Sequence, residues 1–121
     1  MSKVDIFELR LAHQDGTLAV LEVTGYINNE AGEAISQRAR QLLSDGHRAL
    51  LFDLQGTRII NSIGISLLLE VLEAVLAVEG TLAFCTLSAS IAKTFQIMGL
   101  AQYSRIFPDR SSALAELSPK R

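Results

Sequence analysis

The chain has 121 residues, of which 49% are hydrophobic and 20% charged, and its formal net charge is -2. These values indicate one globular domain with an ordinary core, and they exclude a disordered or fibrous chain. Acidic and basic residues are interspersed, the longest basic cluster is Lys120–Arg121, and Trp is absent. A nucleic acid is therefore not expected as the main partner.

The first two predicted elements form a β-hairpin. Apolar runs at 6–12 and 18–23 flank the pair Asp15–Gly16, which is typical of a tight hairpin turn. Asn28 and Asn29 then offer an N-cap to a helix whose apolar residues recur at helical spacing as far as Leu43.

The rest of the chain alternates strands with helices. The predicted elements are a buried strand over 49–54, a helix over about 62–78, a strand over 81–87, a helix capped by Ser88 or Ser90 and ended by Gly99, a strand over 103–107, and a helix capped by Asp109. Such alternation predicts an α/β fold with a mixed, mostly parallel sheet of four to five strands, an N-terminal hairpin and about four helices. We expect a single domain over 1–121, with its core at about 6–117 and a short flexible tail over 118–121.

The predicted helix over 62–78 is unusually apolar. Ser62, Ser66, Glu70 and Glu73 form one narrow polar line, and nearly every other residue is Ile, Leu, Val or Ala. A surface helix normally has a wider polar face. Either this helix is buried on more than one side, or part of its apolar surface awaits a partner.

No segment indicates insertion into a membrane. The first eight residues lack the apolar core of a signal peptide, and Glu70 and Glu73 interrupt the most apolar run well short of a membrane span. We therefore expect a cytoplasmic protein. Cys85, the single cysteine, cannot form an internal disulfide and is expected to be a small buried hydrophobe.

Catalytic motifs are missing from the sequence. It contains no glycine-rich phosphate loop, no dinucleotide-binding fingerprint and no nucleophile elbow. His13 and His47 are expected in exposed loops without the spacing of metal ligands. Spacing alone does not exclude a triad of Ser62, a histidine and Asp53, but the apolar neighbours of Asp53 favour a structural role. We predict no enzyme activity, no cofactor and no metal.

The turn at 61–64, Asn-Ser-Ile-Gly, is the strongest candidate for a functional site. Asn61 or Ser62 could simply cap the following helix, while Gly64 permits close packing. Alternatively, Ser62 could accept a phosphate, because a helix N-terminus favours an anion. A phosphate would add about 1.5 to 2 negative charges to the surrounding surface, and this could eject a partner from an apolar surface without unfolding the domain.

From about Ile6 to Leu117 the chain resembles a STAS domain of the bacterial anti-sigma factor antagonist family. The resemblance rests on the order and spacing of several segments, namely Gly25-Tyr-Ile27, Leu51-Phe-Asp-Leu54, Asn61-Ser-Ile-Gly-Ile65, Gly80-Thr-Leu-Ala-Phe84 and Phe95-Gln-Ile-Met-Gly-Leu100. It implies a protein that binds, unphosphorylated, to an anti-sigma factor that is also a serine kinase. Phosphorylation then releases the antagonist, and a phosphatase resets it.

Carried onto this chain, the resemblance implies Ser62 as the phosphorylated residue. The residues implied in partner binding are Ile27, Asn28, Asn61, Ser62, Ile63, Ser66 and Leu67. The chain departs from the family at Asn61, where Asp is usual, and at Ile63, where a small residue is common. A monomer or weak dimer is expected. The alternative is a STAS scaffold subunit of a larger signalling or transport assembly, in which charge at Ser62 does not control binding.

Overall fold

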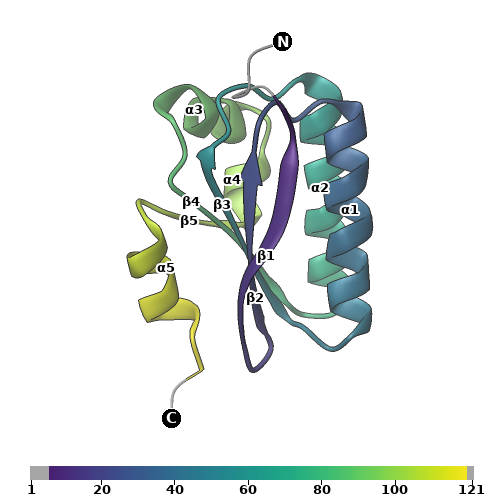
Figure 1. The fold of residues 1–121 in the computed structure, drawn as a ribbon, viewed down its shortest axis with the longest axis vertical. Helices are drawn as coiled ribbons and strands as arrows, with labels where there is room; N and C mark the ends of the chain where they lie inside the picture. Colours follow the sequence, from purple (N-terminus) through teal and green to yellow (C-terminus); the bar gives the residue numbers. More distant parts are fainter. Residues whose placement is uncertain (1–5, 120–121) are drawn as a thin grey trace.

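The computed structural model describes residues 6–119, within which five strands and five helices form three layers (Figure 1). In chain order the elements are β1 (Glu8–Asp15), β2 (Leu18–Thr24), α1 (Asn29–Ser44), β3 (Ala49–Gly56), α2 (Ser62–Ala77), β4 (Thr81–Cys85), α3 (Ala89–Ile97), α4 (Leu100–Tyr103), β5 (Arg105–Phe107) and α5 (Arg110–Leu117). Residues 1–5 and 120–121, which include half of the expected tail, lie outside the described residues.

The five strands form one sheet in the order β1-β2-β3-β4-β5. β1 pairs antiparallel with β2, and every other neighbouring pair is parallel. A β-bulge interrupts the register of β1 between Leu11 and His13. The predicted hairpin and the predicted mixed, mostly parallel sheet are therefore confirmed, with five strands.

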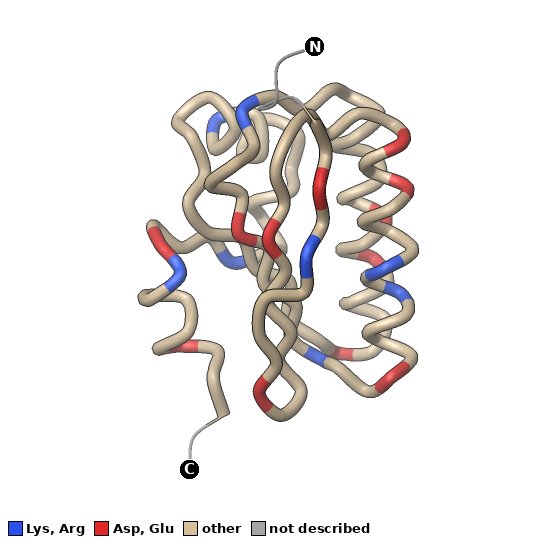
Figure 2. The backbone as a smooth tube through the Cα atoms, in the orientation of Figure 1, with Lys and Arg blue, Asp and Glu red and all other residues tan. Residues whose placement is uncertain are grey.

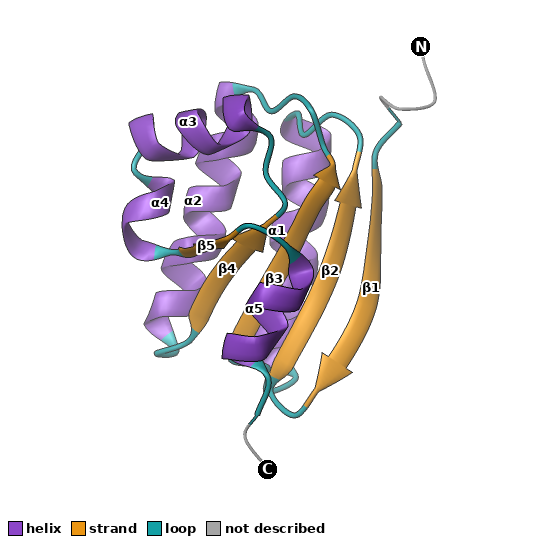
Figure 3. Ribbon diagram, turned by 90° about the vertical axis from the view of Figure 1, so that its left-hand side faces the viewer, coloured by secondary structure: helices purple, strands orange, loops and turns teal. Residues whose placement is uncertain are grey.

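Alternation along the central strands divides the buried side chains between two faces of the sheet. In β3, Leu50, Phe52 and Leu54 point into one core, whereas Leu51 points into the other. The helices α1 and α2 cover the first face, and α5 alone lies across the second (Figure 3). We call these the two-helix face and the α5 face.

The two-helix face holds the larger core. Phe84 at its centre stacks on Phe52, with ring centroids 5.9 Å apart, and meets Phe95 of α3 edge-to-face at 4.9 Å. The apolar helix α2 is buried against this face and against α1, where a Cβ atom at Gly32 would lie only 2.6 Å from Leu67 Cδ1. Burial on more than one side therefore accounts for most of the apolar surface of α2, although Ile63 and Leu76 are exposed.

Some sequence predictions are wrong in detail. The first strand runs to Asp15 instead of ending near residue 12, so His13 lies in β1 and not in the turn. His47 is half-buried, because its ring nitrogens contact Leu42 O at 3.1 Å and Gln14 Oε1 at 3.0 Å.

The unpredicted helix α4 occupies the region before the last strand, which is why that strand begins at Arg105 and not at Tyr103. Gly99, with a φ of 82°, ends α3 and lets the chain turn directly into α4. Within the described residues there are therefore five helices, where about four were expected.

Charged residues are dispersed over the fold. Figure 2 shows Lys and Arg interspersed with Asp and Glu along the coloured part of the backbone, in keeping with the mixed charge pattern of the sequence. Across residues 6–119, no helix has the length and apolarity needed to cross a membrane.

Candidate functional site

Ser62 lies at the end of the sheet where the parallel strands β2 and β3 lead into α1 and α2. Two backbone hydrogen bonds bind the two connecting loops to each other. Ile27 N donates to Ile59 O at 3.0 Å and Asn61 N donates to Ile27 O at 3.1 Å, and together they make an isolated parallel bridge between Ile27 and Ile60. The loop that carries Ser62 is therefore held in a defined position by the loop after β2.

Asn61, and not Ser62, supplies the side-chain cap of α2. Its Oδ1 accepts a hydrogen bond from Gly64 N at 2.7 Å, and its extended backbone (φ -92°, ψ 174°) is that of an N-cap residue. Ser62 is the first residue of the helix and is exposed. The structure thus answers the capping question in favour of Asn61, and it leaves the Ser62 side chain facing solvent at the positive end of the helix dipole.

Gly64 brings the start of α2 close to the loop after β2. A Cβ atom at this position would lie 2.5 Å from Ile27 O, and backbone does not yield as a flexible side chain does. Gly64 therefore permits close packing, as expected from the sequence. The atom that approaches it is the backbone carbonyl oxygen of Ile27.

The predicted docking residues fall into two groups. Ser62, Ile63 and Ser66 are exposed, and Asn28 and Asn61 are half-buried. Ile59, which the sequence prediction did not include, is 54% exposed and is the apolar counterpart of Ile63 on the other side of Ser62 in the chain. These six residues form what we call the Ser62 surface.

Ile27 and Leu67 belong to the second group. Their side chains are 0% and 8% exposed, so they contribute to the core instead of to a contact surface. Ile27 positions the loop of Ser62 through its backbone, and Leu67 seats α2 against Gly32 of α1. We therefore exclude their side chains from the Ser62 surface.

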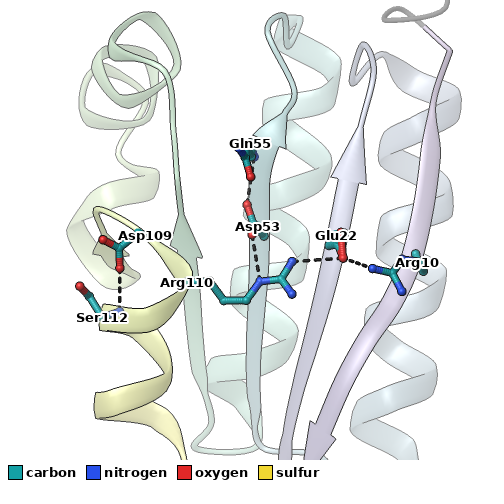
Figure 4. A network of polar contacts seen from close by, with 7 residues as sticks. All are labelled: Arg10, Glu22, Asp53, Gln55, Asp109, Arg110 and Ser112. Atoms are coloured by element: carbon teal, nitrogen blue, oxygen red, sulfur yellow. Dashed lines mark hydrogen bonds and ion pairs between the residues drawn. The ribbon is translucent and has the colours of Figure 1, made fainter.

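A polar network crosses the α5 face between α5, β3, β2 and β1 (Figure 4). Arg110 Nε donates to Asp53 Oδ2 at 3.0 Å, and Arg110 also pairs with Glu22 Oε1 at 3.2 Å. Glu22 pairs in turn with Arg10, and Asp53 Oδ1 accepts from Gln55 N at 3.0 Å. The hydrogen bond from Arg110 is the main cause of a pKa for Glu22 below its ordinary value.

Asp53 therefore has a structural partner, as its apolar neighbours in the sequence favoured. The network as a whole was not predicted from the sequence. Asp53 and Arg110 are 57 positions apart, and no local pattern links them. The one available signal was a carboxylate at the end of a buried strand, which requires a compensating charge.

The described residues show no assembled catalytic or metal site. Asp53 is bound by Arg110 and by Gln55 N, and the ring of His47 contacts Leu42 O and Gln14 Oε1. Among residues 6–119, no hydrogen bond joins Ser62 to a histidine or a histidine to Asp53. Within residues 6–119, no group of three His, Cys, Asp or Glu side chains is placed to hold a metal ion.

A pocket of about 210 Å³ lies beside the polar network and is lined by Glu22, Val23, Thr24, Asp53, Gln55 and Gly56. Its two carboxylates are the ones already paired with arginines. The pocket is therefore a hollow beside an ion-pair network and offers no free acid–base pair for catalysis.

Comparisons with known proteins give a family and a fold. The family model of the STAS domain matches residues 8–113. No curated protein sequence matches the chain. An anti-sigma factor antagonist from Mycobacterium paratuberculosis superposes with a TM-score of 0.80 at 23% identity, over 95% of this chain and 97% of that one.

Two further solved structures share the fold. The Bacillus cell fate determinant SpoIIAA in its phosphorylated form gives a TM-score of 0.70 at 19% identity, over 93% of this chain and 99% of that one. A sulfate transporter family protein from Wolinella succinogenes gives 0.69 at 16% identity, over 82% and 83% of the two chains. At such identities the likeness establishes the fold alone.

Proposed function

Because the chain belongs to the STAS domain family, we propose that it is an anti-sigma factor antagonist that acts by partner switching. Unphosphorylated, it binds a cytoplasmic anti-sigma factor that is also a serine kinase, and so frees a sigma factor. Phosphorylation of Ser62 by that kinase ends the complex, and a phosphatase restores the binding form. The protein is itself a binding module without catalytic residues or cofactor.

The observation that supports this proposal most directly is the setting of Ser62. Its side chain is exposed on the first turn of α2, where Asn61 already supplies the cap. A phosphate on Ser62 therefore displaces no capping interaction, and the helix N-terminus favours its charge. The fold accepts the modification while the Ser62 surface changes.

The change at the surface is large enough to act as a switch. Ile59 and Ile63, 54% and 53% exposed, make the unmodified surface apolar on both sides of Ser62 in the chain. We propose that the partner buries these two side chains together with Ser62. A phosphate brings about 1.5 to 2 negative charges into that interface, and desolvating an unpaired charge costs far more than a docked apolar side chain contributes.

The proposal is tested by affinity capture from a lysate of the source organism with three variants as baits. Ser62→Ala keeps the surface uncharged, and Ser62→Asp adds a charge there. Ser90→Asp is the matched control, since Ser90 is exposed in the first turn of α3, where Ser88 supplies the cap. We expect Ser62→Ala and Ser90→Asp to retain an ATPase with serine kinase activity and Ser62→Asp to lose it. The captured kinase and ATP should phosphorylate the wild-type protein on the peptide containing Ser62, as read by mass spectrometry.

The fold shared with a sulfate transporter family protein favours a second candidate, a scaffold subunit that is not switched. In that case Ser62→Ala and Ser62→Asp retain the same protein equally. Binding would then depend on Ile63. Adding the substitution Ile63→Ser to either of these baits would abolish capture of the protein. Equal capture by the Ser62→Ala and Ser62→Asp baits would therefore favour the scaffold function over the phosphorylation switch.

A further inference from the structure

The short helix α5 is attached to the fold differently from the two long helices, α1 and α2. Of its eight residues, Ala113 is fully buried, and Leu114 and Leu117 are partly buried against the sheet. In contrast, α1 and α2 each bury seven residues. Because local stability follows the buried apolar contacts of an element, α5 is the least strongly packed of the three.

What α5 covers is strongly apolar. The sheet residues of the α5 face are at most 9% exposed and comprise Leu18, Val20, Leu51, Ala83, Cys85 and Phe107. Removing α5 would open this surface to solvent while the two-helix face stayed intact, since the two cores lie on opposite sides of the sheet.

Charge compensates for the weak packing of α5. Arg110, the first residue of the helix, pairs with Asp53 of β3 and Glu22 of β2. The Asp53 side chain is only 7% exposed, so this ion pair is partly shielded from water. The other ion pair of α5, Arg105 to Glu116 at 3.7 Å, joins side chains that are 48% and 62% exposed and contributes little.

We infer that α5 is a releasable cover, which opens as a unit while the rest of the domain stays folded, and that Arg110 controls how often it opens. Opening breaks the pairs of Arg110 with Asp53 and Glu22 and exposes the α5 face. This device is independent of the Ser62 surface, which lies at the start of α2 on the other side of the sheet. The domain thus has a second surface, whose exposure depends on ion pairing and not on phosphorylation.

Cys85 reports the opening without any engineering. It is the single cysteine of the chain, it is 0% exposed, and it shares the small core with Ala113 of α5. Burial is the main reason why its pKa lies above the ordinary thiol value, which further suppresses its reaction while α5 is docked. Rapid reaction of this thiol therefore requires the cover to open.

The test measures the rate at which a thiol reagent such as dithionitrobenzoate modifies Cys85 in the folded protein as a function of urea. Local opening gives a rate that depends much less on urea than global unfolding does, because little surface is exposed. We expect that weak dependence in the wild type. Arg110→Met should raise the rate about tenfold, since a charge-assisted hydrogen bond is lost. Arg105→Met, which breaks the exposed pair, is the matched control and should change it less than about twofold.

Two results would overturn the inference. One is a modification rate that follows global unfolding in the wild type. The other is an equal rate in Arg110→Met and Arg105→Met once global stability, measured by urea unfolding, has been taken into account. If Arg110→Met does not fold, hydrogen exchange on the wild-type protein decides the matter. The amides of Ala113 and Ser118, bonded within the α5 segment, must then exchange faster than the amides of β3, and equal protection would refute the cover.

Discussion

The two faces of the sheet are stabilised in different ways. The two-helix face is a packed apolar core with stacked phenylalanine rings at its centre. The α5 face has a smaller apolar core and is bounded by the ion pairs of Arg110. The stability of the two-helix face therefore depends on side-chain packing, and that of the α5 face depends also on ion pairs. Core substitutions and changes of pH should affect the two faces unequally.

The largest expected effect is loss of packing on the two-helix face. Phe84 is 0% exposed and contacts both Phe52 and Phe95. Phe84→Ala should lower the free energy of unfolding by about 3 to 5 kcal/mol, whereas Leu117→Ala on the half-buried end of α5 should lower it by less than about 1.5 kcal/mol. Urea unfolding followed by circular dichroism measures both, and equal losses would contradict the difference between the faces.

A smaller effect is expected where α2 meets the neighbouring loop. Gly64→Ala should cost about 1 to 3 kcal/mol, because the new Cβ atom meets the backbone oxygen of Ile27 at 2.5 Å. Gly32→Ala is the matched control within α1, since its Cβ atom would meet the movable Cδ1 of Leu67. We expect the control to be less destabilising by about 1 kcal/mol, measured in the same unfolding assay.

The cap of α2 gives the next prediction. Asn61→Ala removes the bond from Gly64 N to Asn61 Oδ1 and should cost about 1 kcal/mol. Ser62→Ala should change the stability by less than about 0.5 kcal/mol, because Ser62 is an exposed helical residue that does not supply the cap. A larger loss in Ser62→Ala than in Asn61→Ala would reverse the assignment of the cap.

The α5 face should be the acid-sensitive one. The pKa of Glu22 lies below its ordinary value of 4.5, chiefly through the hydrogen bond from Arg110. In the folded state Glu22 therefore binds fewer protons than in the unfolded state. Its contribution is complete above pH 4.5 and is lost as the pH falls through the lowered value. The pKa of Asp109, lowered chiefly by the backbone hydrogen bond from Ser112, acts in the same direction.

Thermal unfolding measured between about pH 6 and pH 3 tests this assignment. We expect the wild-type protein to lose stability below pH 4.5 more steeply than Glu22→Gln does. Identical pH profiles for the two proteins would show that Glu22 is not coupled to folding.

The sequence predicts most of the fold because local signals and packing agree. Short, nearly continuous apolar runs predict the buried strands β2, β3 and β4. The pair Asp15–Gly16 predicts the hairpin, and the caps Asn28 and Asp109 predict the starts of α1 and α5. The prediction missed α4, because a four-residue helix is too short to show a helical period in the sequence. In addition, Gly99 indicates the end of a helix and gives no sign that another helix begins after it.

The candidate site could be predicted in part. The turn at 61–64 identifies Ser62 by its position, but the choice of Asn61 as the cap requires the geometry of its Oδ1. The resemblance implied Ile27 and Leu67 as contact residues, but their side chains are buried in the core, and sequence alone does not separate a buried apolar residue from an exposed one. The pairing of Arg110 with Asp53 is set by the tertiary fold and has no local signature.

The β-bulge in β1 affects how readily the edge of the sheet can aggregate. An open sheet edge is a template on which strands of other molecules can add, and a long, regular edge invites growth into fibrils. The outer edge of β1 carries exposed Glu8, Arg10 and His13 and loses its register at the bulge. The opposite edge, β5, is only three residues long. Both edges of the sheet are therefore poor templates for the growth of sheets between copies of this domain.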